Sequence, residues 1–541
     1  MPIQYNDALD DRLIYDACMA FTGGQVSNVR SNLLGETQFA EGVNVDIDRF
    51  GSVVTRRGSE EQLGTVPPPT EDDWEAITTN WEDYGTLWEN SAGPIRGLGY
   101  FDITGQEEML CVADGILYKS SGSTWSSVSG YSPTSSNAVE FAQLSGKIFM
   151  SDGSNNVHSY NGTTVTDEGN TSSDPPVCKY LVAHTNRLFA AGTSTNDELA
   201  ASGVTDGTSW SSADSIQIGA DGDPITGIAP WYGHNLLVFK ERSIFNVVAD
   251  PSETDMANWV VQNVDRRIGC VSHRSIAQVG SDVFFLARDG IRTVRTILEG
   301  AQTAVSEPIS IGIQDVIDDI NWSYAIEKAA ATFWNNHYIL SIPTGSSTVN
   351  NTVVAYSTVS KSFVGKWTGW NANDFEVSAF SGFTKLNFGS STGKVLTWLD
   401  YVAESSETDS TYQDAGADYE SSVTSRGLVF GERFNRLQPR HVEVEFKAAR
   451  SSSVEVRPVS DLELGRKLNS SDINTNTSSV TLPVTLPFTL PIEKPVIKSY
   501  NLLTRGPCRE IQFRVKTSAN KMHLRSLRAS AYVRSMELET A

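Results

Sequence analysis

The apolar residues of this chain occur in short runs separated by turns rich in Gly, Asp, Asn and Ser. Met109–Ala113 is such a run, Asp114-Gly115 after it is a two-residue hairpin signal, and Ile116–Lys119 predicts the returning strand. A Ser/Gly turn then precedes a third strand that begins near Trp125. With Ile95–Ile103 in front, the unit has four strands, which is the size of one β-propeller blade.

Similar strand–turn–strand units recur at intervals of about 40 to 50 residues, the range expected for propeller repeats. They cover residues 137–165, 177–210, 224–264, 275–305, 331–367 and 384–399. No copy contains a Gly-His…Trp-Asp pair or a Kelch double glycine, so the spacing alone predicts a propeller of about six or seven blades. Stacked β-sandwiches, which also have many short strands at regular spacing, are the alternative.

Residues 1–95 precede the first full unit and contain two notable stretches. Asn44–Gly58 alternates on both sides of Phe50-Gly51 and predicts a hairpin, which we expect at the propeller seam. Thr70–Asn90 interleaves acidic residues with aromatic ones. It is either a solvated loop or short helix that covers a neighbouring surface, or a docking loop with Trp74, Trp81 and Trp88 as its anchors.

The predicted propeller covers residues 96–403. Within it, only Ser310–Ile320 has apolar residues at helical spacing, so we expect one helical insertion between blades. Residues 404–420 are small, polar and acidic, which predicts a linker. Residues 421–541 contain alternating strands such as His441–Lys447, with one wet face and one buried face. The fold class is therefore all-β, a propeller followed by a C-terminal β-sandwich.

An unusual stretch lies inside the sandwich region. Every even position from Val480 to Ile492 is apolar, and every odd position is Thr or Pro. An extended chain places all these apolar groups on one face, and the prolines remove amide donors from one edge. The stretch is therefore an edge strand or an arm whose face must be covered, either within the sandwich or by a neighbouring subunit. Its candidate subunit contacts are Leu482, Leu486, Phe488 and Leu490.

Length and charge limit the possible functions. A chain of 541 residues is too long for one core and predicts at least two domains. The net charge is −23, yet residues 421–541 hold roughly 19 basic against 11 acidic residues, so the acid is concentrated in the first part. Such acidity disfavours direct binding of phosphate groups. The five cysteines are scattered, as expected of small buried residues in a reducing compartment. Neither a signal peptide nor a membrane-spanning run is expected.

The sequence offers little support for catalysis. The seven histidines are isolated from one another, and neither His-Glu-x-x-His nor Cys-x-x-Cys occurs, so no metal is expected. Gly389–Lys394 resembles a phosphate-binding loop, but it is one residue short and is followed by Val395, so a hairpin turn is expected instead. No nucleophile elbow and no correctly spaced sialidase box occur. We therefore expect a protein without cofactors that is not an enzyme.

Several strings, taken in their order along the chain, resemble a known family. They are Gly23-Gly24, Leu34, Glu41–Val45, Gly51, Arg56–Gly58, Trp231–Phe245, Val305–Ser310, HYILSIP from His337 and VVAYSTVSKSFVGKW from Val353. In this order they resemble the tail nozzle, or tail tube B-like, proteins of short-tailed bacteriophages. The resemblance implies a structural subunit of a virion, located in the phage tail and assembled in the host cytoplasm. It also implies a homohexameric ring that joins an adaptor protein above and fibres or a needle around or below.

Two hypotheses follow for function. As a nozzle subunit, the chain forms a channel through which viral DNA passes transiently, and an acidic channel wall would let the duplex pass without binding it. As a carbohydrate-binding or glycoside-cleaving propeller, it would have a cleft at the propeller axis lined by aromatic residues and carboxylates. The missing sialidase boxes and the opposed charges of the two regions favour the first hypothesis. In neither case does the chain insert into a membrane.

Overall fold

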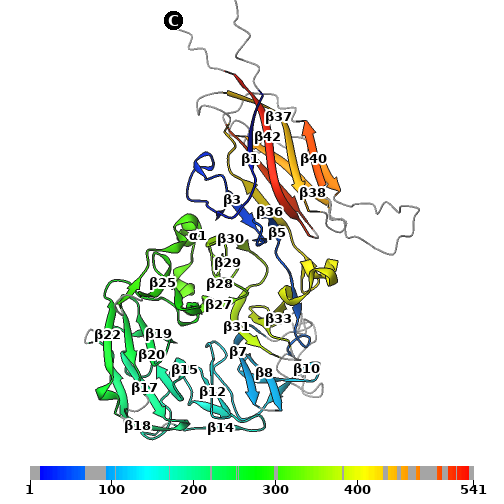
Figure 1. Ribbon diagram of the computed structural model, residues 1–541. Helices are drawn as coiled ribbons and strands as arrows, with labels where there is room; N and C mark the ends of the chain where they lie inside the picture. Colours follow the sequence, from blue (N-terminus) through cyan, green and yellow to red (C-terminus); the bar gives the residue numbers. More distant parts are fainter. Residues whose placement is uncertain are drawn as a thin grey trace, which may run out of the picture.

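The computed structural model is almost entirely β-structure and has two parts, a propeller and a β-sandwich that lies beside it (Figure 1). The ranges that the structure describes are 13–67, 93–103, 105–169, 171–219, 222–250, 253, 255–297, 302–379, 383–429, 436–447, 453–460, 471–474, 496–501, 510–518 and 521–534. Both the candidate docking tryptophans and the Val480–Ile492 stretch lie outside these residues.

In the residues that the structure describes, the propeller has seven four-stranded blades, so the predicted fold class is confirmed and the blade count is the upper of the two expected values. The first blade contains β7 (Ile95–Ile103), β8 (Gln106–Ala113), β9 (Ile116–Ser121) and β10 (Thr124–Val128). The second contains β11 (Glu140–Leu144), β12 (Lys147–Ser151), β13 (His158–Tyr160) and β14 (Val165–Asp167). The third contains β15 (Tyr180–His184), β16 (Arg187–Ala191), β17 (Glu198–Gly203) and β18 (Asp206–Gln217). The fourth blade contains β19 (Ile225–Pro230), β20 (Asn235–Lys240), β21 (Ile244–Val248) and β22 (Val260–Asp265). The fifth contains β23 (Ala277–Val279), β24 (Asp282–Ala287), β25 (Gly290–Ile297) and β26 (Gln302–Val305). The sixth contains β27 (Ala330–Trp334), β28 (His337–Ile342), β29 (Thr352–Ser357) and β30 (Ser362–Trp367).

The seventh blade closes the ring with strands from two distant parts of the chain. Three of them are β31 (Ala372–Ser378), β32 (Lys385–Ser390) and β33 (Val395–Trp398), and the fourth is β6 (Ser59–Glu61). β6 runs antiparallel to β33, with Ser59 opposite Trp398. An early strand therefore does complete the last blade, but it is not the predicted hairpin.

That hairpin is β4 (Val45–Ile47) and β5 (Val53–Thr55), and it belongs to the sandwich, where β5 pairs with β42 (His523–Arg534). The prediction that it lies at the propeller seam is therefore wrong. The reason is apolar burial, because Val45, Ile47 and Val53 face the core that the sandwich shares with the last blades.

Local sequence signals set the turns inside the blades. Asp114 and Gly115 both have positive φ, 50° and 75°, which is the conformation that an Asp-Gly hairpin turn between β8 and β9 requires. Gly389–Lys394 likewise covers the turn between β32 and β33 rather than a phosphate loop. Gly99 in β7 has another role, because a Cβ there would lie 2.7 Å from the Phe141 ring. The first strands of neighbouring blades therefore pack closely around the axis.

The predicted helical insertion is present. It consists of the 3₁₀ helix η5 (Ile309–Ile313) and α1 (Gln314–Asp318), and a second helix, α2 (Trp322–Lys328), follows. Further short 3₁₀ helices are η1 (Ser31–Leu33), η3 (Met256–Asn258), η4 (His273–Ser275), η7 (Leu399–Tyr401), η8 (Glu404–Ser406) and η9 (Asp409–Tyr412).

The sandwich is built from both ends of the chain. One sheet contains β1 (Leu13–Cys18), β4, β5, β37 (Arg436–Phe446), β40 (Val496–Asn501) and β42. The other contains β2 (Gly24–Gln25), β3 (Gln38–Val43), β36 (Ser421–Ser425), β38 (Ser453–Ser460), β39 (Ser471–Asn474) and β41 (Ile511–Thr517). Because β3 also pairs with β30, this second sheet continues into the sixth blade. The expected division at residue 421 therefore does not separate the two parts, which share strands and a core.

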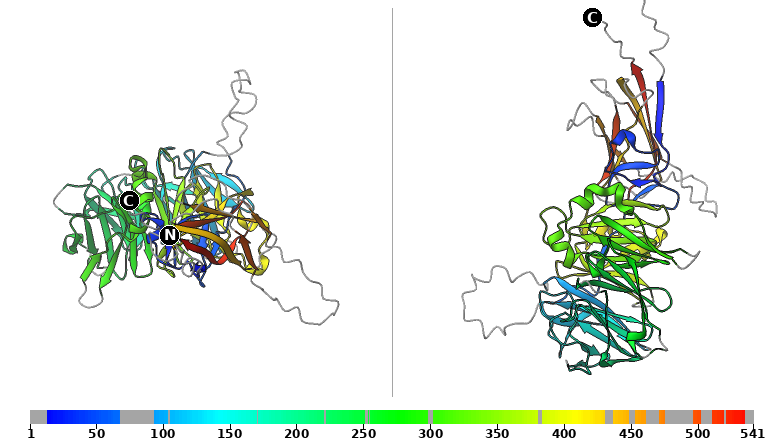
Figure 2. Two further views of the ribbon diagram at one scale, coloured as in Figure 1. Left: turned by 90° about the horizontal axis from the view of Figure 1, so that it is seen from above. Right: turned by 90° about the vertical axis from the view of Figure 1, so that its left-hand side faces the viewer.

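The segment 404–420, expected as a linker, has regular structure. It holds η8, η9 and the short strands β34 (Gln413–Asp414) and β35 (Ala417–Asp418). β34 pairs with β6, so this acidic segment extends the sheet of the seventh blade. Figure 2 shows that the sandwich prolongs the propeller disc sideways instead of covering one of its faces.

Candidate functional site

A compact group of ionisable side chains lies on the propeller axis, around Arg274 of η4. Its Nε donates a hydrogen bond to Oε1 of Glu140 at 2.8 Å, and its Nη2 lies 3.7 Å from Oδ2 of Asp374. Nη1 and Nη2 also donate to the backbone carbonyls of Arg96 at 3.0 Å and of Val139 at 2.7 Å. One side chain from the fifth blade thus joins the first strands of the first, second and seventh blades across the axis.

These contacts shift the pKa values of Glu140 and His273. Burial alone would raise the pKa of Glu140, but the charges of Arg274 and His273 keep it below its ordinary value. Burial lowers the pKa of His273, which stacks on Tyr180 at a ring distance of 4.8 Å. Arg274 is 9% exposed at its side chain, so water screens these interactions weakly. Glu140 and Arg274 therefore form a largely buried ion pair at the centre of the propeller.

Two carboxyl groups on β31 behave differently. Burial raises the pKa of Asp374 to about 6, although Arg274 acts in the opposite direction. Burial and the nearby Asp374 raise the pKa of Glu376 to about 8. At neutral pH, Glu376 is thus mainly protonated and Asp374 mainly ionised. Two carboxyl groups with separated pKa values are what a general acid/base pair requires.

Arg274 borders two cavities along the axis. One, of about 520 Å³, opens where the first strands of the blades begin, and it contacts Arg96, Lys179, Tyr180 and Lys328. The other, of about 290 Å³, lies farther along these strands and contacts Asp374, Glu376 and the ring of Phe375. Ligand cavities commonly have volumes of about 300 to 1,000 Å³, so the first is large enough for a small molecule and the second is marginal.

The junction between propeller and sandwich contains a second charged cluster. Arg56 is fully buried and pairs with Asp414, and its Nη2 donates to the carbonyl of Thr368 at 2.9 Å. Its guanidinium also lies 4.1 Å from the ring centre of Tyr419. Arg57 pairs with Glu407 at 2.7 Å. These two arginines therefore fasten the 404–420 segment to the strand that leads into β6.

A large cavity of about 920 Å³ lies at this junction. Polar and charged contacts surround it: Nε2 of His523 lies 3.0 Å from Oδ2 of Asp48, and Lys447 pairs with Glu404 at 2.8 Å. The lysine contacts lower the pKa of Glu404 to about 2. Because its charges are paired with one another, this cavity has no evident surplus charge for a ligand.

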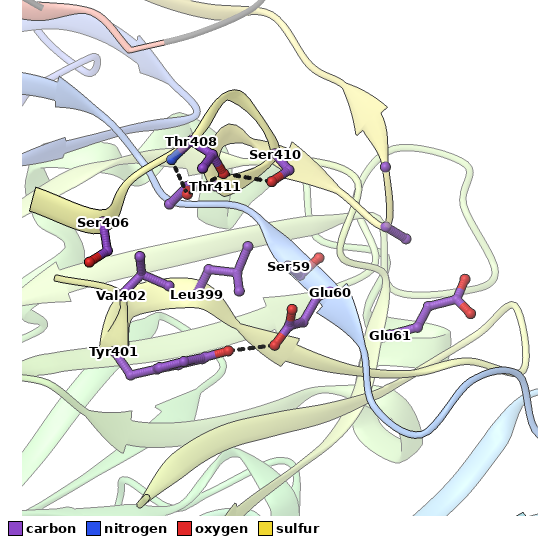
Figure 3. Close-up of a pocket in the computed structure, with 12 residues that line it drawn as sticks. Ser59, Glu60, Glu61, Leu399, Tyr401, Val402, Ser406, Thr408, Ser410 and Thr411 are labelled. Carbon is purple, nitrogen blue, oxygen red and sulfur yellow. Dashed lines mark hydrogen bonds between the residues drawn. The ribbon is translucent and has the colours of Figure 1, made fainter. Parts of the chain in front are cut away.

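A shallower cavity of about 420 Å³ lies beside the seam strand β6 (Figure 3). Tyr401 donates a hydrogen bond to Glu60 across it, and the Thr408–Thr411 capping box forms another part of the wall. Burial and Glu60 raise the pKa of Tyr401, so its hydroxyl stays protonated at neutral pH. Nothing in this arrangement activates a nucleophile.

Among the described residues, no group of three or more His, Cys, Asp or Glu side chains could hold a metal ion. Cys18, Cys111, Cys178 and Cys270 are free and buried, and burial raises the pKa of Cys18 and Cys270 to about 11. No helix within the described ranges is long and apolar enough to cross a membrane.

The sequence did not reveal the axial cluster. β31 was missed because polar residues alternate with its few apolar ones, and η4 is too short to leave a pattern. The sequence marks Arg56–Gly58 and Glu41–Val45 as strings of interest but does not predict their contacts, which join residues more than 300 positions apart. Only the wrapping of the chain brings such residues together.

Comparison with known proteins yields similarity of fold alone. No protein-family model matches the sequence, and no curated protein matches it. Among solved structures, YCF48 bound to a D1 peptide is 10% identical and covers 64% of this chain and 100% of its own, with a TM-score of 0.37. BamB from Moraxella catarrhalis is 11% identical, with 73% and 99% covered and a TM-score of 0.37. The WD40 propeller domain of Doa1 is 11% identical, with 56% and 92% covered and a TM-score of 0.35.

Proposed function

We propose that this chain is a structural subunit of a tail nozzle ring of a short-tailed bacteriophage. In this role it forms a homohexamer in the virion tail, surrounds the DNA exit channel, and contacts an adaptor protein and a fibre or needle protein. It acts by assembly rather than by catalysis.

The observation that supports this proposal is where the resembling strings lie. A Cβ on Gly24 would lie 2.5 Å from the carbonyl oxygen of Phe363, and a Cβ on Gly365 would lie 2.9 Å from that of Gly42. The side chain of Asn44, which has a φ of 52°, bonds to Arg56 at 3.1 Å and to Thr368 at 3.0 Å. Residues from separate strings thus contact one another and build the junction of propeller and sandwich.

This clustering matters because weak matches that arise by chance should be scattered over the blades. Here several of them determine how the sandwich is attached to the sixth and seventh blades. A shared junction is what members of a two-part structural family would have in common.

The propeller axis gives further support. Arg274 bonds across it to three other blades, so a nucleic acid would have to pass between subunits of a ring rather than through the axis of one propeller. The surplus of acidic residues outside 421–541 supplies carboxylates for the channel wall. Duplex DNA carries one phosphate charge per about 1.7 Å, and an acidic wall would repel it evenly.

Native mass measurement tests the proposal. We expect the purified chain, alone or with an adaptor protein, to form a closed ring of about six copies, as symmetric oligomers do. The ring should not bind duplex DNA tightly at low salt. A chain that stays monomeric with the adaptor present, or a ring with tight salt-sensitive duplex binding, would contradict it.

The axial acids favour one second candidate, a carbohydrate-binding or glycoside-cleaving propeller. Asp374 and Glu376 line the same 290 Å³ cavity with well-separated pKa values. If this candidate is correct, the monomer should bind or cleave oligosaccharides. Asp374→Asn should then abolish that activity, while Asp409→Asn, at an exposed position of η9, should not.

A further inference from the structure

The 520 Å³ cavity at the mouth of the axis differs in charge from most of the first part of the chain. Four cationic side chains reach it, namely Arg96, Lys179, Arg274 and Lys328. It lies on the propeller, within the region that holds the surplus of acidic residues. The excess of cationic over acidic side chains in this lining, on an otherwise acidic part of the chain, therefore needs a physical explanation.

Three acidic side chains also line the cavity, one fewer than the cationic ones, and they differ in how their oxygens are bound. Glu140 is paired with Arg274, and Asp152 accepts backbone N–H bonds from Thr134 at 2.8 Å, Ser154 at 3.0 Å and Asn155 at 2.7 Å. Glu327 on α2 is exposed. Asp114 acts on Arg96 from outside the cavity lining and accepts a hydrogen bond from the N–H of Gly93.

The cations other than Arg274 are not matched in this way. The Nε of Arg96 donates to the carbonyl of Ser135 at 3.0 Å, while its two Nη atoms have no protein partner within the described ranges. Lys328 donates to the carbonyl of Thr348 at 2.6 Å and lies 5.3 Å from the ring centre of Tyr324, and the charge of the exposed Glu327 acts on it as well. The Lys179 stem packs against Gly153, where a Cβ would lie 2.7 Å from its Cγ.

These cations also repel one another. Burial and the charge of Arg96 lower the pKa of Lys328, with Glu327 opposing the shift. Burial, together with the charge of Arg274, lowers the pKa of Arg96, with Asp114 opposing it. Repulsion of this kind is relieved when an anion binds between the charges.

We infer that this mouth of the propeller is a binding site for a dianionic phosphate group, held by Arg96, Lys328 and Lys179. The free edge of the Arg96 guanidinium supplies two parallel donors for two phosphate oxygens, and the lysines supply point charges. Ser136, Asn137 and Asn373 also line the cavity, but their hydroxyl and amide groups already donate to protein acceptors, so the three cations supply the binding. The phosphate belongs either to free inorganic phosphate or to a small phosphate ester, because 520 Å³ leaves room for further atoms.

This inference is independent of the proposed ring function. It concerns one face of a single propeller and would hold for a monomer as well as for a ring.

Calorimetric titration of the full chain tests it, with inorganic phosphate, glycerol phosphate and acetate as probes. We expect both phosphates to bind and acetate to bind at least tenfold more weakly. Tighter binding of glycerol phosphate would identify an ester as the ligand, and equal binding would identify the phosphate group alone.

Arg96→Gln and Lys328→Gln should each weaken phosphate binding at least tenfold, which corresponds to about 1.4 kcal/mol. Arg295→Gln is the matched control, since it removes one arginine charge from a half-exposed position on β25 and should leave binding unchanged. Lys179→Gln is a further variant at an exposed side chain, so its folding is not at risk, and it should weaken binding as well. Absence of phosphate binding at 10 mM, or equal binding by the three cavity variants and the control, would overturn the inference.

Discussion

Replacement of Arg274 by methionine is the most informative perturbation of the propeller. Methionine keeps much of the length of the side chain but removes the charge and all of its hydrogen bonds. In the native protein, Arg274 compensates Glu140 at 2.8 Å and Asp374 at 3.7 Å, and it satisfies two backbone carbonyls. The variant therefore leaves two carboxyl groups near the axis without their cation.

The expected loss of unfolding free energy is about 3–5 kcal/mol at pH 7.5, the usual cost of removing one partner from a buried ion pair. Little discount for solvent is needed, because the Arg274 side chain is 9% exposed and that of Glu140 is 17% exposed. The loss should shrink as the pH falls. Glu140 has a lowered pKa in the native protein, so its stabilising contribution exists above its ordinary pKa and disappears as the group is protonated.

Urea unfolding at pH 3 and pH 7.5, followed by tryptophan fluorescence, measures this dependence. The double variant Arg274→Met with Glu140→Gln should recover part of the loss, because removing both charges of a buried pair costs less than removing one. Arg295→Met, at a half-exposed position on β25, should change stability by less than about 1 kcal/mol. A loss below about 1 kcal/mol at pH 7.5, or the same loss at both pH values, would refute the axial role of Arg274.

Three further predictions concern the axis, the seam and the arm. Glu376→Gln should stabilise the protein above pH 7. The native pKa of Glu376 is raised to about 8, so the wild type loses stability as the pH rises from about 4.5 to 8. Thermal melting across that range measures the effect, and a curve parallel to that of the exposed control Glu36→Gln would contradict it. Gly58→Ala should destabilise the seam by about 1–3 kcal/mol, because the new Cβ would lie 1.9 Å from the carbonyl oxygen of Gln413. The control is Gly35→Ala, where the nearest atom to the new Cβ is Oε1 of the Gln38 side chain at 3.4 Å. We expect Gly58→Ala to be proteolysed faster than this control, and equal rates would count against the prediction. Leu486→Asp with Phe488→Asp should prevent ring formation while the monomer stays folded; unfolding of the monomer, seen by circular dichroism, would mean that these residues belong to the internal core.

The blades follow from local patterns in the amino-acid sequence. Alternation of apolar and polar residues, together with turns such as Asp114-Gly115 and Ser145-Gly146, specifies strands and hairpins through contacts between near neighbours. The repeat length then predicted a propeller of about the observed size. The turn at Gly389–Lys394 and the helical residues near 314–318 were predictable for the same reason.

The positions of the two ends of the chain, in contrast, depend on long-range contacts. β6 and the β4–β5 hairpin have similar local patterns, and their placement in different sheets depends on partners more than 300 residues away. The same holds for Arg274, whose neighbours come from three other blades, and for Arg56, whose carboxylate partner is Asp414. Burial and charge pairing at these points depend on how the ring closes, and no periodic pattern in the sequence records ring closure.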